Sequence, residues 1–81
     1  MVQCSQVDVQ ILTGRRMCLI VDQTNDCVSD IQEKIRIKEG IHPDVQILLY
    51  NGISLPPYMT ARELQLHDGS LMFLSIRNRG G

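Results

Sequence analysis

One segment of the sequence has the apolar spacing of an amphipathic helix several turns long, and this restricts the possible folds more than any other feature. Val28, Ile31 and Ile35 recur three and four residues apart with charged residues between them, so they form one apolar stripe. Gly40 follows the stripe, where glycine readily adopts the left-handed conformation that ends a helix, and Pro43 prevents continuation. One such helix must bury its stripe against other elements, and the remaining apolar segments have strand patterns.

Strand patterns flank this helix on both sides. Val7, Val9 and Ile11 alternate with polar residues, as in a half-buried strand, and a turn containing Gly14 separates them from a second strand at residues 17–21. After the helix we expect a strand at 46–50, an Asn51-Gly52 hairpin turn, a short strand at 53–55, one helical turn at 60–64 and a strand at 70–76. This order predicts an α+β fold of the β-grasp type, with a mixed four- to five-stranded sheet packed on one α-helix.

The size and charge of the chain limit the functions that it can have. Because 81 residues suffice for one small core, we expect a single domain at residues 1–76. Eight basic and nine acidic side chains give a net charge of −1, which argues against a nucleic-acid binder because such a protein needs a basic face. No apolar run approaches the roughly 20 residues that span a bilayer, and the N-terminus lacks a signal-peptide pattern. We expect no membrane contact and a location in the cytoplasm, the nucleus or both.

The cysteines and histidines form no catalytic or metal-binding pattern. Cys4, Cys18 and Cys27 are odd in number and include no C-x-x-C pair, which argues against a disulfide framework and against a zinc site. Cys18 lies in an apolar run, where we expect it to behave as a small hydrophobic residue. His42 and His67 are isolated, and we expect both to be surface or loop residues. The sequence predicts that the protein is not an enzyme and holds no cofactor or metal.

Three motifs, in the right order and at the right separations, resemble ubiquitin. They are Leu12-Thr13-Gly14 in the first hairpin, Lys34-x-x-x-Lys38-Glu39-Gly40-Ile41-x-Pro43-Asp44 at the end of the helix, and Arg77-x-Arg79-Gly80-Gly81 at the C-terminus. The resemblance extends from about Gln6 to Gly81 and includes the strand and helix patterns between the motifs. It is therefore much more specific than any one motif, and we expect a diverged member of the ubiquitin family.

The resemblance implies a reaction for the C-terminal residues. In ubiquitin-like modifiers the terminal glycine carboxylate is adenylated with ATP, passed to an enzyme cysteine as a thioester and joined to a target amine. By this resemblance Gly81 carries the reacting carboxylate and Gly80 leaves steric room beside it. Arg77 and Arg79 match arginines that contact the activating enzyme and the deconjugating proteases. We expect a flexible tail at residues 77–81, and a monomer whose partners are activating, conjugating and deconjugating enzymes and ubiquitin-receptor proteins.

The resemblance also implies a partner-binding patch on the sheet. The strand patterns direct Leu48, Leu55, Met72 and Leu74 toward the core, so their neighbours in the same strands face outward. The expected patch consists of Leu12, Ile47, Leu49, Ile53 and Phe73. An exposed apolar cluster of this size usually marks an interaction site.

The two lysines of the sequence determine whether copies of the protein can be joined to one another through lysine side chains. Lys34 and Lys38 both lie on the predicted helix and match lysines of ubiquitin, so they are possible acceptors. A solvated helix face beside Glu33 and Glu39 explains them equally well. The positions of ubiquitin's principal chain-forming lysines hold Ile53 and Asp68, which excludes the common polymers.

Other interpretations of the C-terminal residues remain open. The Gly-Gly sequence can mark the point where a domain of a longer protein stops, and such a domain would dock noncovalently on ubiquitin receptors or the proteasome through the patch. An RNA-binding arginine-glycine segment is disfavoured because a single copy lies on a net-acidic domain. A bacterial-type sulfur carrier also ends a β-grasp in Gly-Gly, but the first two motifs favour the ubiquitin branch.

Overall fold

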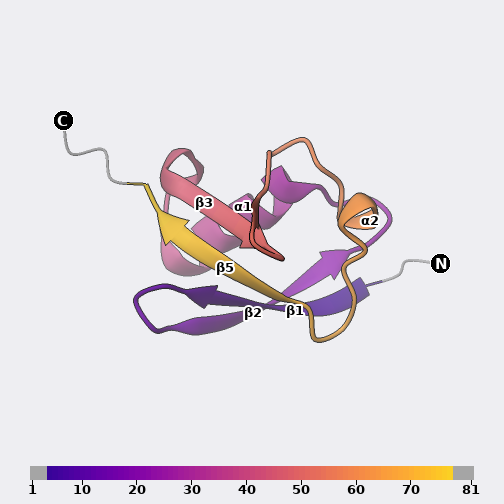
Figure 1. The fold of residues 1–81 in the computed structure, drawn as a ribbon, viewed down its shortest axis with the longest axis horizontal. Helices are drawn as coiled ribbons and strands as arrows, with labels where there is room; N and C mark the ends of the chain where they lie inside the picture. Colours follow the sequence, from indigo (N-terminus) through magenta and orange to yellow (C-terminus); the bar gives the residue numbers. More distant parts are fainter. Residues whose placement is uncertain (1–3, 78–81) are drawn as a thin grey trace.

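The computed structural model describes residues 4–77. Their elements, in chain order, are β1 (Cys4–Ile11), β2 (Arg16–Asp22), α1 (Val28–Glu39), the short 3-10 helix η1 (Pro43–Val45), β3 (Gln46–Tyr50), β4 (Ile53–Ser54), α2 (Ala61–Leu64) and β5 (Leu71–Ile76). The predicted hairpins, long helix, short helical turn and last strand are all present at or within a few residues of their expected positions (Figure 1).

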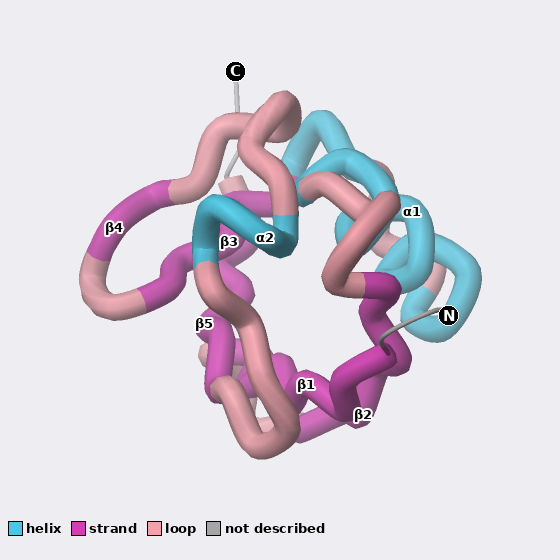
Figure 2. Tube along the Cα trace, turned by 90° about the vertical axis from the view of Figure 1, so that its right-hand side faces the viewer, coloured by secondary structure: helices cyan, strands magenta, loops and turns pink. Residues whose placement is uncertain are grey.

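The five strands form one mixed sheet in the order β2-β1-β5-β3-β4. The neighbours β1 and β5 are parallel, whereas the other neighbouring strands are antiparallel. Figure 2 shows the strands along an arc with α1 on its concave side. The expected β-grasp architecture is confirmed, and the sheet has five strands.

The core lies between the sheet and α1. Val28, Ile31 and Ile35, which form the predicted stripe of α1, are fully buried. The strands and the segment after β4 contribute the rest of the buried apolar side chains: Val7, Val9, Ile11, Leu19, Val21, Leu48, Leu55, Ala61, Leu66, Met72 and Leu74. Within residues 4–77, no helix has the length and apolarity needed to cross a membrane.

The two ends of α1 are determined by local groups. At the first turn, the Asp30 carboxylate accepts a hydrogen bond from the Cys27 backbone N–H at 2.9 Å. Such a reciprocal contact satisfies a donor that has no partner within the helix. At the other end, Gly40 has a φ of 73° and donates its N–H to the Arg36 carbonyl at 2.8 Å. The predicted stop of the helix at Gly40 is therefore confirmed, whereas the cap formed by Cys27 and Asp30 was not predicted.

Acidification is expected to weaken the fold through two turn carboxylates. Hydrogen bonds from the backbone N–H and then the thiol of Cys27 lower the pKa of Asp30 below 3.8, the usual value for aspartate. The side chain of Asn25 and the backbone N–H of Thr24 lower the pKa of Asp22 in the same direction. Because unfolded aspartate binds protons more readily, this stabilisation is complete above the unfolded pKa and is lost as pH falls through the folded values.

Urea unfolding at a series of pH values measures this effect. We expect the urea concentration at the unfolding midpoint to decrease as the pH is lowered from about 5 to about 2. The double variant Asp22→Asn, Asp30→Asn should show a smaller decrease. An equal fall in the parent and the double variant would show that other carboxylates cause the acid sensitivity.

Candidate partner-binding surface and C-terminal segment

The outer face of β3 and β5 carries apolar side chains. In β5, Met72 and Leu74 are fully buried, whereas Phe73, between them, has 39% of its surface exposed. In β3, Leu48 is buried, and its neighbours Ile47 and Leu49 are half-buried. The alternation predicted for these two strands is confirmed, and it leaves an apolar row on the side of the sheet away from α1.

Strand pairing brings these side chains together. Leu49 lies directly opposite Phe73, and Ile47 lies opposite Ser75. The Leu12 backbone N–H donates to the Leu74 carbonyl at 3.1 Å, which fixes the first hairpin turn beside the end of β5. Leu12 itself is 64% exposed. We call Leu12, Ile47, Leu49 and Phe73 the outer-face patch.

The other apolar residue of the expected patch, Ile53, points to the opposite side of the sheet from the patch. Ile53 is 63% exposed but pairs with Tyr50, whose side chain packs against the core. Directly paired residues of antiparallel strands point to the same side of a sheet. Ser54, and not Ile53, is therefore the residue opposite Leu49 on the patch side.

The outer face includes a further apolar residue that sequence reasoning missed. Leu71 is half-buried and is in phase with Phe73 along β5, so it lies on the same side of the sheet. The two-residue period that identified Phe73 also identifies Leu71. Gln10 lies opposite Phe73 on the neighbouring strand β1 and accepts a hydrogen bond from Arg16 Nε at 3.1 Å. A polar rim therefore borders the patch on its β1 side.

The segment after β5 begins at a residue attached to the sheet. The Arg77 backbone N–H donates to the Val45 carbonyl at 2.6 Å, and the Arg77 side chain is exposed. The pairing between β5 and β3 thus extends one residue into the segment that was expected to be a flexible tail. The other residues expected to act in conjugation, Arg79, Gly80 and Gly81, lie outside the described residues.

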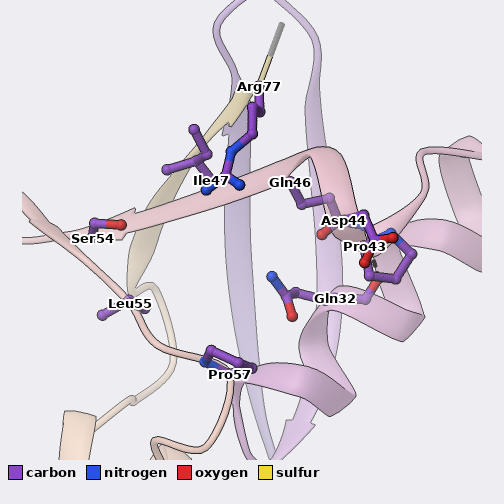
Figure 3. Close-up of a pocket in the computed structure, with 9 residues that line it drawn as sticks. All are labelled: Gln32, Pro43, Asp44, Gln46, Ile47, Ser54, Leu55, Pro57 and Arg77. Carbon is purple, nitrogen blue, oxygen red and sulfur yellow. Dashed lines mark hydrogen bonds between the residues drawn. The ribbon is translucent and has the colours of Figure 1, made fainter. Parts of the chain in front are cut away.

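A hollow of about 320 Å³ lies beside Arg77. It is lined by Gln32, Pro43, Asp44, Gln46, Ile47, Ser54, Leu55, Pro57 and Arg77. Figure 3 shows the Gln32 side chain extending from α1 into this space and Arg77 on the opposite side. The hollow therefore separates the end of β5 from α1 and the segment after β4.

A buried glutamine forms one wall of the hollow. Gln46 Nε2 donates to the backbone carbonyls of Gln32 at 3.0 Å and Ile41 at 2.9 Å. These bonds attach the middle of α1 and the loop after the helix to β3. Gln46 Oε1 is buried and accepts no hydrogen bond from any residue of the 4–77 segment. Sequence reasoning treated Gln46 only as a strand residue, because no local pattern signals a buried polar side chain.

The two candidate acceptor lysines have different surroundings. Lys34 is half-buried, and its Nζ lies 3.6 Å from the Asp26 carboxylate. Lys38 is exposed, and no ion pair to it is found within residues 4–77. Geometry therefore makes Lys38 the more accessible amine of the two.

The expectation that Cys18 behaves as a small hydrophobic residue was wrong. Cys18 is exposed on the outer face of β2, where its thiol donates to the Asp8 carboxylate at 2.9 Å and accepts from Gln6 Nε2 at 3.0 Å. The period of the strand explains this, because Leu19 and Val21 face the core and Cys18 is out of phase with both.

His42 and His67 are exposed, as expected. In the described part of the chain, no group of three or more His, Cys, Asp or Glu side chains is placed to hold a metal ion.

Comparisons with known proteins match nearly the whole chain. The model of the Ubiquitin family matches residues 7–79. Ubiquitin-like protein 1 of Schizosaccharomyces pombe is 39% identical over 75 residues, which cover 93% of this chain and 95% of that protein. NEDD8-like protein RUB3 of Arabidopsis thaliana is 34% identical over 76 residues, covering 94% and 96%. Among solved structures, Caldiarchaeum subterraneum ubiquitin has a TM-score of 0.86 and 25% identity, and the match covers 98% of this chain and 100% of that one.

Proposed function

Because this chain belongs to the ubiquitin family, we propose that it is a protein modifier joined to target amines through the carboxylate of Gly81. The sequence Arg77-Asn78-Arg79-Gly80-Gly81, in a chain that relatives named ubiquitin-like and NEDD8-like match over 93% and 94% of its length, is the observation that carries this proposal. The carboxylate acts either as the native terminus or after a protease exposes it. The protein is a substrate of this chemistry and not its catalyst.

The proposed reaction proceeds in one adenylyl-transfer step followed by three acyl-transfer steps. The Gly81 carboxylate attacks the α-phosphorus of ATP and pyrophosphate leaves, which gives an acyl adenylate. A cysteine thiolate of the activating enzyme then attacks the acyl carbon and AMP leaves. After transfer to a conjugating enzyme, a target amine attacks the thioester, the thiolate leaves, and an isopeptide bond forms. The Gly81 carboxylate is the nucleophile of the first step, and every later step uses a nucleophile from a partner, so the modifier needs only an accessible carboxylate.

The described residues support separate roles for the folded body and the tail. Arg77 is exposed at the end of β5, where an acidic surface of an activating enzyme or protease can pair with its guanidinium. The outer-face patch offers an apolar docking surface beside it. Activating, conjugating and deconjugating enzymes and ubiquitin receptors are the proposed partners, and the cytoplasm, the nucleus or both are the proposed location.

A charging assay tests the proposal. The chain is incubated with ATP, magnesium and a panel of modifier-activating enzymes, and the products are resolved with and without a thiol reductant. We expect an enzyme adduct that the reductant removes, because a thioester is cleaved by thiols. If every activating enzyme in the panel stays uncharged while its own modifier charges it, the conjugation proposal is wrong.

A second function, noncovalent docking as a domain of a larger protein, is favoured by the outer-face patch alone. This function needs no free carboxylate at Gly81. A chain that binds ubiquitin receptors but fails the charging assay would support it.

Truncating Phe73 is expected to weaken receptor binding under either function. Phe73 lies opposite Leu49 at the centre of the outer-face patch, and aromatic side chains at interface centres often carry much of the binding energy. For any ubiquitin-receptor domain that binds the parent, Phe73→Ala should raise the Kd by about tenfold or more. Ile37→Ala is the control, because Ile37 is an exposed apolar residue on α1, outside the patch. Equal effects of the two variants would place the contact elsewhere.

A further inference from the structure

The two edges of the sheet are protected differently. An edge strand presents unpaired backbone N–H and C=O groups to other chains, and proteins shield such edges with short strands, charges or proline. The edge strand β4 has only two residues, and Pro56 follows shortly after it. The opposite edge strand, β2, has seven residues. Only one of the two edges is therefore shielded by its length.

The centre of β2 lacks the other protective features as well. Residues 17–21 contain no charge, proline or glycine. On the outer face, Ile20 is 58% exposed and Cys18 is exposed, although apolar side chains elsewhere on β2 are buried or half-buried. An apolar, uncharged edge strand of this length favours pairing with another strand.

The hydrogen-bond pattern shows which backbone groups remain available. The Ile11 N–H donates to the Arg15 carbonyl at 2.7 Å, and antiparallel pairs alternate between bonded and non-bonded along the strands. Leu19 therefore directs its backbone groups toward β1, whereas Arg16, Cys18 and Ile20 direct theirs toward the open edge.

The open edge ends at Asp22. The Asp22 N–H donates to the Asp26 carboxylate at 2.9 Å, and the Asp22 carbonyl accepts from the Asp26 N–H at 2.9 Å. The turn after β2 thus occupies the outward backbone groups of this residue. The available ladder consists of Arg16, Cys18 and Ile20.

This edge is complementary to itself. If two copies of β2 run antiparallel about a two-fold axis at Leu19, Cys18 of each copy faces Ile20 of the other. The unpaired backbone N–H and C=O groups of these two residues can then form hydrogen bonds between the copies. In the same register Arg16 of each copy lies opposite Asp22 of the other, so opposite charges meet at both ends. A shift of two residues in either direction separates these charges. We propose that the protein self-associates through antiparallel pairing of β2 with β2 of a second copy.

The proposed contact is independent of the conjugation function. It joins the two sheets into one continuous sheet and buries Ile20 against the second copy. It uses the edge opposite β4, so β3 and β4 stay uncovered. The proposal departs from the monomer expected from the sequence.

Sedimentation of the reduced protein over a concentration series tests the proposal. We expect the average mass to rise from 9.2 kDa toward twice that value. Ile20→Lys adds a charge to the apolar centre of the edge and should raise the dimer dissociation constant by about tenfold or more. Ile37→Lys is the matched control, because Ile37 is also an exposed isoleucine but lies on α1, and this variant should associate like the parent. A parent that stays monomeric up to millimolar concentration overturns the proposal.

A crosslinking experiment tests the register. In the proposed pairing the two Cys18 side chains are diagonal neighbours on the same face, about 7–8 Å apart. In a Cys4→Ser, Cys27→Ser background, a short bifunctional thiol reagent should link two copies through Cys18, and adding Ile20→Lys should remove the product. Association without this crosslink, or a crosslink unaffected by Ile20→Lys, would show that the copies meet elsewhere.

Discussion

A variant that lacks Gly81 is expected to form no thioester with an activating enzyme that charges the parent. The reason is chemical, because the new terminal carboxylate belongs to Gly80 and is one residue, about 3.5 Å of extended chain, short of the activated position. Misplacing a reacting group by far less already costs large factors in rate. The measurement is the reductant-sensitive adduct, and we expect its yield to fall to the level seen without ATP.

Two controls separate this effect from a damaged protein. Asn78→Ala changes the same segment but keeps Gly80 and Gly81, and it should charge like the parent. The variant that lacks Gly81 should also bind receptor domains with the parent's affinity, because the outer-face patch lies on the sheet and in the first hairpin turn. A normal adduct from the shortened chain would mean that Gly81 is not the acylating residue.

Replacement of Ile35 by alanine is expected to give the largest loss of stability. Ile35 is fully buried on the core side of α1. Isoleucine-to-alanine changes at such sites cost about 2–5 kcal/mol, because apolar contact is lost and the surroundings fill the cavity only in part. A small domain has a total unfolding free energy of about 5–15 kcal/mol. The variant should therefore unfold at a much lower urea concentration than the parent.

The same helix provides the matched control. Ile37 is two residues away, on the opposite side of α1, and is 70% exposed. Ile37→Ala makes the same chemical change and should alter the unfolding free energy by less than about 0.5 kcal/mol. Similar losses in the two variants would contradict the burial pattern of α1.

Local patterns in the sequence determined which elements form and where they end. The spacing of Val28, Ile31 and Ile35 and the position of Gly40 predicted α1, and its end and its buried face are confirmed. Asn51 and Gly52 both have positive φ values, 53° and 78°, as the predicted hairpin turn requires. These signals act over a few residues, so the sequence alone can reveal them. The resemblance to ubiquitin then supplied the family, which the comparisons confirm.

Only the tertiary structure decided which elements lie side by side and what each exposed side chain meets. Leu49 and Phe73 are far apart in the chain and become neighbours because β5 lies between β1 and β3. The register directed Ile53 to the opposite side of the sheet from the outer-face patch. It also left β2 at an open edge and buried Gln46 against α1 and the loop after it. Strand order and register depend on contacts between distant residues, and local periodicity does not record those contacts.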